Sequence, residues 1–453
     1  MAIDLERLVD DFVELASEYS DLDFSAPYGK LNLPRHVPDV TCLRIELAWP
    51  NKTELQLASV LIDADGLDDP VNQTVRRMSS AWSDEHQEML DRGDLFKPKR
   101  RAAAVRTKWE DRPWLEIEFD QPVDLRRVRL RNIGGSGPGG SSTRVRGIHL
   151  LVRTTDGWWT TIYDGWQRER EFLQLVERKH SGTLMARSLE HKVRRRLNRP
   201  ATPEDHRIEG DLIKILSGIQ IGTYNNLKVF KDLNRVGLSP EEVAELQTLI
   251  TDKMLAKRQM EFNLHGLRRT FRFWSEAEKR RYLQFTVDVA NCLQKLNGNA
   301  CLGFGSVLAV VRDHELLPHD DDLDVIIGFD PNDASTLAEA RELIKKHLSD
   351  NGFKVVGNYA SHTWVYPPWG GSKIDAFVSI FEGDSIAWYP SRRGSLTRDM
   401  VFPPREQSLM GIDCPVPRQP EAYLEGVYGP GWSTPDPHYR HPWKRSEWSD
   451  IEK

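Results

Sequence analysis

The chain has 453 residues, of which 39% are hydrophobic and 29% are charged, and this is the composition of a globular protein. The length exceeds that of one ordinary domain, so two or three domains are expected. A formal net charge of −6 gives no general reason to bind nucleic acid, and no nucleic-acid partner is expected. The four cysteines lie far apart without a C-x-x-C pair, which argues against a zinc site or a redox pair.

The first 40 residues are expected to form a helix and a lead-in segment. Apolar residues between positions 4 and 19 recur at near-helical spacing, and residues 20–40 read as a loop. This start lacks the charged and apolar regions of a signal peptide, and no stretch approaches the roughly 18 apolar residues of a membrane span. We therefore expect a cytoplasmic protein, with peripheral association at the inner face of the membrane, or with a biosynthetic complex, as the open alternative.

Residues 41–166 change to a period of two, which predicts an antiparallel β-sandwich. Apolar and polar residues alternate at 43–48, 115–119 and 127–131. The stretches WLEIEFDQPVDLRRVRLRN and RVRGIHLLVRTTDGWWTTIYDG resemble the discoidin (coagulation factor 5/8 type C) family, which implies a jelly roll. Many members of that family bind sugars or lipid head groups at loops on one end. The alternative is that Trp158, Trp159 and Trp166 fill the core or pack on a neighbouring domain.

Residues 167–274 are expected to be a helical connecting region. The basic run 191–199 could touch anionic head groups or a phosphate-bearing acceptor, or it could be a solvated helix face. A further helix is predicted to begin at Ser275, with Glu278 completing a capping box, and to end at Gly298. This helix opens the last predicted domain, residues 275–453.

The segment 299–329 follows this helix and contains the residues with the clearest chemistry. Gly305 permits a tight turn and a close approach to a ligand. Ser306 adds a hydroxyl and a backbone N–H near a predicted helix start, where phosphate binds well. Arg312 stands at the end of that helix, and its guanidinium can bind an anion.

Two aspartates, Asp322 and Asp324, enter an apolar strand. Residues two apart in a strand point to the same face, so their carboxylates converge while Leu323 points into the core. Converging carboxylates repel unless a cation joins them, and Mg²⁺ commonly takes one or two carboxylates plus substrate phosphates. The alternative is an acidic pair on a solvated strand.

A third carboxylate, Asp375, lies in the predicted strand 373–378 between apolar neighbours. An isolated charge there would be costly, so a metal-binding or proton-transfer role is expected. The alternative is a strand-end aspartate that accepts hydrogen bonds from backbone N–H groups.

These residues stand in a pattern that resembles the LicD and fukutin family of nucleotidyltransferase-fold proteins. The first motif reads GSVLAVVRDHELLPHDDDLDV, the third carboxylate stands in KIDAF, and PVPRQPEAYLEGVYGPGWSTP resembles the closing element of the family. The resemblance spans roughly residues 280–440. Two positions depart from the family pattern: His319 replaces a tryptophan and Ala309 replaces a glycine.

The resemblance implies transfer of a phospho-alcohol, such as phosphocholine or phosphoribitol, from a CDP-linked donor to a glycan or lipid-linked glycan, with release of CMP. It also implies Mg²⁺ or Mn²⁺ as cofactor, held by Asp322, Asp324 and Asp375. The implied contacts to the donor and its phosphates come from Gly305, Ser306, Arg312, His319 and Lys373. Catalytic roles are implied for Asp322, Asp324, Asp375 and Arg312.

The fold class expected from all these segments is an α+β multidomain protein. It would have an N-terminal antiparallel β-sandwich, a helical linker region and a C-terminal nucleotidyltransferase-fold α/β domain. Two other functions stay open from the sequence. One is a nucleotidyltransferase that releases pyrophosphate, and the other is a non-catalytic carbohydrate-binding or scaffold protein.

Overall fold

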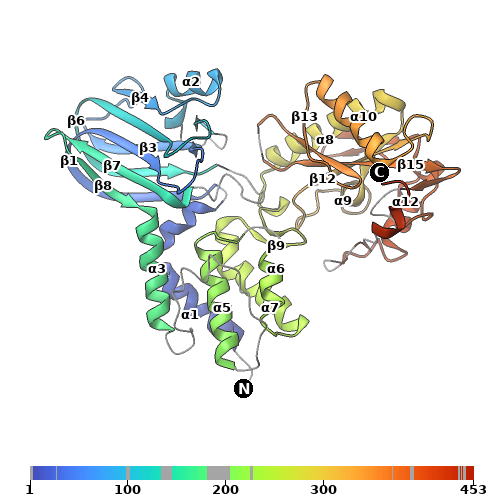
Figure 1. Cartoon of the computed structure of the whole chain (residues 1–453), viewed down its shortest axis with the longest axis horizontal. Helices are drawn as coiled ribbons and strands as arrows, with labels where there is room; N and C mark the ends of the chain where they lie inside the picture. Colours follow the sequence, from blue (N-terminus) through green and yellow to red (C-terminus); the bar gives the residue numbers. More distant parts are fainter. Residues whose placement is uncertain are drawn as a thin grey trace. The chain divides into compact units, whose positions relative to one another are not determined.

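The chain folds into two compact units, Met1–Arg269 and Thr270–Lys453, in a computed structural model (Figure 1). The residues that the structure describes are 4–26, 28–97, 103–133, 145–180, 205–224, 228–369, 371–387, 392–436, 439, 441 and 445–452. The basic run 191–199 lies outside them.

The N-terminal unit contains a six-stranded antiparallel sheet with the order β3-β6-β1-β7-β8, in which β4 also pairs with β6. Its strands are β1 (Lys30–Leu47), β3 (Ser59–Asp65), β4 (Thr74–Met78), β6 (Trp114–Arg131), β7 (Ile148–Thr154) and β8 (Trp159–Asp164). A separate pair joins β2 (Gln56–Leu57) to β5 (Val105–Arg106). The predicted antiparallel sheet is therefore present, while the discoidin-like character stays a prediction.

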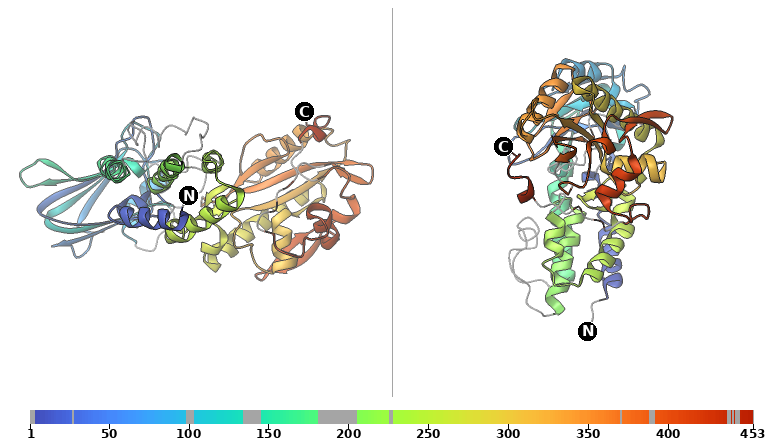
Figure 2. Two further views of the ribbon diagram at one scale, coloured as in Figure 1. Left: turned by 90° about the horizontal axis from the view of Figure 1, so that it is seen from below. Right: turned by 90° about the vertical axis from the view of Figure 1, so that its right-hand side faces the viewer.

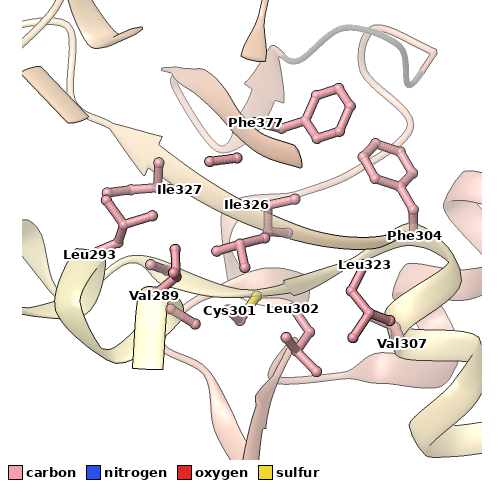
Figure 3. Close-up of a cluster of buried hydrophobic side chains, with 14 of the residues drawn as sticks. Val289, Leu293, Cys301, Leu302, Phe304, Val307, Leu323, Ile326, Ile327 and Phe377 are labelled. Atoms are coloured by element: carbon pink, nitrogen blue, oxygen red, sulfur yellow. The ribbon is translucent and has the colours of Figure 1, made fainter. Parts of the chain in front are cut away.

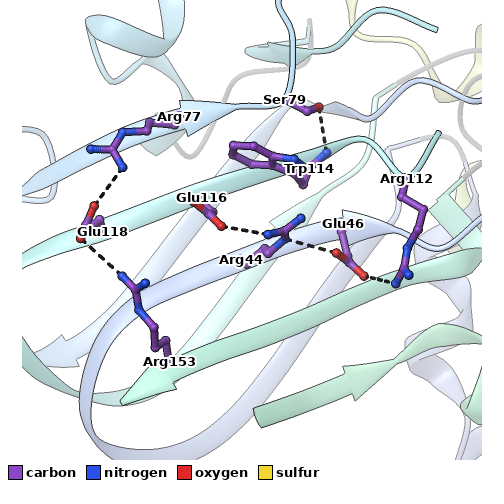
Figure 4. Close-up of polar contacts among 9 residues, drawn as sticks. All are labelled: Arg44, Glu46, Arg77, Ser79, Arg112, Trp114, Glu116, Glu118 and Arg153. Carbon is purple, nitrogen blue, oxygen red and sulfur yellow. Dashed lines mark hydrogen bonds and ion pairs between the residues drawn. The ribbon is translucent and has the colours of Figure 1, made fainter. Parts of the chain in front are cut away.

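The two faces of this sheet follow the period of two that the sequence predicts. Leu43, Ile45 and Ile117 point into the buried core. The alternate residues on the same strands are charged and form ion pairs on the other face. Two runs of ion pairs cross that face: Arg77–Glu118–Arg153 and Glu116–Arg44–Glu46–Arg112 (Figure 4).

The helices of the N-terminal unit form a second core of their own. These helices are α1 (Leu5–Ser17), α3 (Gly165–Lys179), α5 (Asp205–Gln220), α6 (Lys228–Leu233) and α7 (Pro240–Ile250), whereas α2 (Asp84–Asp91) contributes Leu90 to the core of the sheet. Phe12 of α1, Phe172 of α3 and Leu216 of α5 are among its buried residues. Helices α3 and α5 run along the same direction, side-on in Figure 1 and end-on in the left view of Figure 2. A short hairpin, β9 (Glu261–Asn263) and β10 (Gly266–Arg268), closes the unit.

Two of the three tryptophans that were expected to pack are exposed. The side chains of Trp158 and Trp159 are 75% and 38% exposed, because they stand at a tight turn and at the outer strand β8. The prediction that they fill the core is therefore wrong. Trp166 is partly buried and donates a hydrogen bond from Nε1 to the carbonyl of Ala48 at 2.7 Å.

The C-terminal unit is built on a mixed sheet with the order β11-β12-β15-β14-β13, in which β16 also pairs with β15. Its strands are β11 (Ala300–Gly303), β12 (Leu323–Phe329), β13 (Lys354–Val356), β14 (His362–Tyr366), β15 (Ile374–Glu382) and β16 (Ser385–Ala387). Only the pairing of β12 with β15 is parallel. Together with the N-terminal sheet and helices, this unit confirms the predicted α+β multidomain class.

Helices and one hairpin complete the C-terminal unit. They are α8 (Glu276–Asn297), α9 (Phe304–Leu308), α10 (Leu337–Asp350), α11 (Arg398–Val401), α12 (Pro420–Tyr428) and the hairpin of β17 (Arg405–Leu409) and β18 (Ile412–Val416). Val289 and Leu293 of α8 pack against the central strands, and Phe304 and Phe377 contact each other beside the sheet (Figure 3). Within the described residues, no helix is both long and apolar enough to cross a membrane.

The start and the end of α8 agree with the sequence prediction. The Ser275 hydroxyl accepts from the backbone N–H of Glu278, whose carboxylate accepts from the N–H of Ser275. Gly298 then ends the helix in the left-handed conformation at φ 79°. These caps fix where the chain enters β11, the first strand of the sheet.

We predict that Gly328→Ala destabilises the C-terminal unit by about 1–3 kcal/mol, because it overpacks the core. A Cβ at Gly328 would lie 2.6 Å from Cζ of Phe381 and 2.8 Å from Cε2 of Phe402. Chemical denaturation measures the change. Gly431→Ala is the matched control, since nothing lies within 4 Å of its added Cβ. Equal stability of the two variants would contradict this account of the packing.

Candidate functional site

Four residues on four neighbouring strands form one row across the C-terminal sheet. Gly303 of β11 pairs with Asp324 of β12, Asp324 pairs with Asp375 of β15, and Asp375 pairs with Trp364 of β14. Residues directly opposite each other on paired strands present their side chains to the same face. The structure therefore brings together two of the predicted carboxylates and places an indole beside them.

Two further predicted residues, Asp322 and Lys373, stand immediately before β12 and β15. The Lys373 ammonium lies 3.0 Å from Oδ2 of Asp322 and also donates to Oδ1 of Asp375. The side chains of Lys373, Asp322 and Asp375 are only 22%, 12% and 16% exposed. This is a largely buried ion-pair cluster, which differs from a surface salt bridge because removal of either partner leaves a buried charge.

The charge of this cluster is unbalanced. Burial, together with the neighbouring carboxylates of Asp322 and Asp375, raises the pKa of Asp324 well above its ordinary value. Burial disfavours the charged form of Lys373, but its two carboxylate partners outweigh this and raise its pKa. Three carboxylates around one ammonium leave an excess of negative charge, and carboxylate oxygens are the ligands that Mg²⁺ takes. The three carboxylates are therefore of the donor type that a divalent cation takes.

Tyr282 of α8 joins the starts of the two parallel strands. Its hydroxyl donates to the carbonyl of Lys373 and accepts from the N–H of Leu323 at 3.3 Å. The side chain is 1% exposed. Helical periodicity accounts for the place of Tyr282 on the buried face of α8. Its bond to two strand starts depends on tertiary contacts that helical periodicity does not describe.

Gly305 and Ser306 lie in the first turn of α9, beside the start of β12. The Ser306 hydroxyl accepts from the N–H of Asp324 at 2.8 Å. A Cβ at Gly305 would lie 2.9 Å from Oδ2 of Asp320, so the missing side chain leaves room for that carboxylate. Phe304 has a φ of +45°, a strained conformation for a bulky residue, and its N–H donates to the hydroxyl of Tyr423 at 2.9 Å.

Arg312 and His319 are placed differently from the carboxylates. The guanidinium of Arg312 forms an ion pair with Asp313 at 2.8 Å and donates to the carbonyl of Trp432 at 3.0 Å. Within the described residues, no hydrogen bond or ion pair joins Arg312 to Asp322, Asp324 or Asp375. His319 is exposed, in a turn before the aspartates. Their predicted roles stay predictions.

The structure also shows aromatic residues near the site that the sequence did not indicate as functional. Tyr359, His362 and Trp364 cluster beside the carboxylates, on and before β14. The alternation of side chains in HTWVY (362–366) predicts a strand, but no local sequence pattern indicates that this strand pairs with β15. Tyr423 of α12 is fully buried, and its hydroxyl accepts a hydrogen bond from the backbone N–H of Phe304.

We predict that Tyr282→Phe lowers the free energy of unfolding of the C-terminal unit by about 1–3 kcal/mol, since it leaves a buried N–H and a buried C=O without their partner. Tyr163→Phe is the matched control, because its hydroxyl donates to Asp21 in the N-terminal unit at 2.9 Å. Denaturation followed by separate probes of the two units measures both. Unchanged stability in Tyr282→Phe would show that the hydroxyl is not the link between the strands.

Comparison with known proteins bears on the C-terminal unit. Residues 297–419 match the family model described as LicD/FKTN/FKRP, nucleotidyltransferase domain. None of the curated proteins compared with the chain matches it. One similar solved structure is "Crystal Structure of ANT(2")-Ia in complex with adenylyl-2"-tobramycin", at 12% identity and a TM-score of 0.24, covering 38% of this chain and 86% of that chain. Residues 297–419 are thus similar to a LicD-type nucleotidyltransferase domain.

Proposed function

We propose that the protein transfers a phospho-alcohol, such as phosphocholine or phosphoribitol, from a CDP-linked donor to a hydroxyl of a cell-surface glycan, with release of CMP. The acceptor would be the glycan or its lipid-linked precursor. The observation that carries the proposal is the row of carboxylates at the starts of β12 and β15, within the region that matches the LicD family. The protein would act in the cytoplasm, free or peripheral at the inner face of the membrane.

Asp322, Asp324 and Asp375 would hold Mg²⁺ or Mn²⁺. When bound, such an ion neutralises charge on the diphosphate of the donor and on the leaving group. Support comes from the raised pKa of Asp324, whose cause is burial among like charges. A cation is the ordinary way to relieve that repulsion.

The donor phosphates would be held by Gly305 and Ser306 in the first turn of α9. The Ser306 hydroxyl already accepts from the N–H of Asp324, and within the described residues no acceptor takes its own hydrogen. That hydrogen can be donated to a phosphate oxygen. Lys373 supplies a charged donor on the same face, and His319 is the candidate for a further donor contact.

The transfer itself needs one bond to form and one to break. The acceptor oxygen bonds to the phosphorus that carries the alcohol, and the bond from this phosphorus to the oxygen of CMP breaks. CMP leaves with the electron pair, and Asp375 accepts the proton of the acceptor hydroxyl. Arg312 would offset charge that develops in this step, and its bond to the Trp432 carbonyl also anchors the closing segment of the domain.

The first test of this function is a panel of CDP- and UDP-linked donors, with and without Mg²⁺. Binding of a donor to the folded state raises the melting temperature by mass action. We expect a response to cytidine donors that depends on Mg²⁺, and CMP as the product. Pyrophosphate as the product would favour a nucleotidyltransferase instead, and no response to any cytidine donor would overturn the proposal.

The second test uses Lys373→Met, which leaves the buried carboxylates without their ammonium partner. In the absence of divalent cations we expect the free energy of unfolding to fall by about 3–5 kcal/mol. Added Mg²⁺ should restore part of this loss, because the ion binds the folded state. Denaturation at increasing Mg²⁺ concentration measures the effect without any assay of activity.

The matched control is Lys253→Met in the N-terminal unit. Lys253 also lies between two carboxylates, at 3.1 Å from Oε1 of Glu6 and 2.7 Å from Oδ1 of Asp10. Those carboxylates are on an exposed helix surface, so we expect little loss of stability and no response to Mg²⁺. If Mg²⁺ stabilised neither the wild type nor Lys373→Met, the cluster would not be a cation site.

A further inference from the structure

An aromatic cluster lies on the face of β14 that also carries the row of site residues. The rings of Tyr359 and His362 stack with centroids 4.6 Å apart and planes within 8°, and the Tyr359 ring lies 4.5 Å from that of Trp364. His362 and Trp364 are two residues apart and only partly buried, whereas Thr363 between them is buried on the opposite face. We call Tyr359, His362 and Trp364 the β14 aromatic cluster.

The loop before β14 holds the β14 aromatic cluster in a defined position. Gly357 has a φ of +99°, and a Cβ there would lie 2.6 Å from Cε2 of Tyr359, so only glycine lets the ring lie where it does. The guanidinium of Arg341 on α10 donates to the carbonyls of Tyr359 and Ala360. The ring stack is therefore supported by backbone geometry and by a side chain from a second element.

The β14 aromatic cluster borders the carboxylate site directly. Trp364 is the residue opposite Asp375, so the two side chains stand next to each other on one face. The Lys373 ammonium lies 5.1 Å from the centroid of the Trp364 ring. Burial, with the nearby Lys373 charge, lowers the pKa of His362 to about 4, so the imidazole is neutral near pH 7. The cluster thus presents uncharged rings next to the reacting groups.

Two buried polar atoms of the β14 aromatic cluster have no hydrogen-bond partner among the described residues. They are Nδ1 of His362 and Nε1 of Trp364. A buried polar atom without a partner costs free energy, and such atoms in a folded protein call for an explanation. An indole N–H can only donate, so the partner it lacks is an acceptor such as a hydroxyl oxygen.

We infer that the β14 aromatic cluster binds the polyhydroxylated part of a substrate, an alditol or a sugar ring. Hydroxyl groups would pair with the indole N–H and the imidazole, and the C–H faces of the ligand would pack on the aromatic rings. A quaternary ammonium group fits less well. It offers no acceptor for the indole N–H, and the Lys373 ammonium already lies near the Trp364 ring.

This inference rests on the proposed function, and it narrows the substrates of the same site. The hydroxyls could belong to the alcohol carried by the donor or to the acceptor sugar. Both sources share the chemistry that the cluster recognises. The experiment therefore has one arm for each source and one for a quaternary ammonium group.

The experiment compares the full-length wild type with Trp364→Phe, which keeps an aromatic ring and removes the N–H. A second variant, His362→Phe, keeps a flat ring against Tyr359 and removes the imidazole nitrogens. Trp369→Phe is the matched control, because Trp369 packs on Phe285 and Arg281, away from the cluster. Binding is measured by ligand-observed NMR and calorimetry with free ribitol, CDP-ribitol, CDP-choline, CDP and a set of methyl glycosides.

We expect Trp364→Phe to weaken one polyhydroxylated probe about five- to tenfold, as the loss of one hydrogen bond predicts. If the wild type binds CDP-ribitol more tightly than CDP and Trp364→Phe does not, the cluster contacts the alcohol carried by the donor. Weaker binding of a methyl glycoside alone would assign it to the acceptor. His362→Phe should act in the same direction, and Trp369→Phe should bind like the wild type.

Two outcomes would overturn the inference. One is that no alditol or glycoside depends on Trp364 or His362, and the other is that CDP-choline alone does. Binding of CDP in the presence of Mg²⁺ is measured as well, so that a failure of this inference can be distinguished from a failure of the proposed function. If CDP binds and no polyhydroxylated probe depends on the cluster, only the inference fails. If CDP does not bind the wild type, the proposed function fails, and free ribitol and the glycosides still test the cluster.

Discussion

The parallel pairing of β12 with β15 is the constraint on which the site depends. It sets Asp324 directly opposite Asp375 in the interior of a sheet, where two like charges on one face repel each other. Neighbouring residues compensate part of this repulsion and hold the strand in place. Lys373 places its ammonium against Asp322 and Asp375, and this positive charge offsets part of the repulsion. The Ser306 hydroxyl accepts a hydrogen bond from the backbone N–H of Asp324 and so holds the start of β12. Such a pairing is costly as a structural element alone, and this cost is the reason for the cation site proposed here.

Two buried tyrosines hold the backbone around this pairing. Tyr282 bonds to the starts of both parallel strands, and Tyr423 bonds to the N–H of the strained Phe304. A strained backbone conformation persists only where neighbouring groups hold it in place. At Phe304 these groups are the Tyr423 hydroxyl and the ring of Phe377. The carboxylates therefore depend on residues that never face the substrate, and the helices α8 and α12 fix the geometry of the strands.

The sequence predicts those features that depend on near neighbours in the chain. Ser275, Glu278 and Gly298 bound a helix because caps are local. Asp324 lies in the predicted apolar strand, whereas Asp322 stands just before it, so the period of two does not by itself place the two carboxylates on one face. The sequence does not predict what lies beside Asp375, since β14 could have paired elsewhere. Trp158 shows the same limit in another way: a large apolar side chain favours burial, but a tight turn at the sheet edge exposes it.

The row across the sheet changes in chemical character from one strand to the next. Gly303 contributes no side chain, Asp324 and Asp375 contribute charge, and Trp364 contributes an aromatic surface with an N–H donor. A substrate that carries a charged diphosphate at one end and a hydroxyl-rich group at the other has the same order of properties. Because the four residues belong to four paired strands, their spacing is fixed by the hydrogen bonds of the sheet, so the two carboxylates and the indole N–H stay at a constant separation.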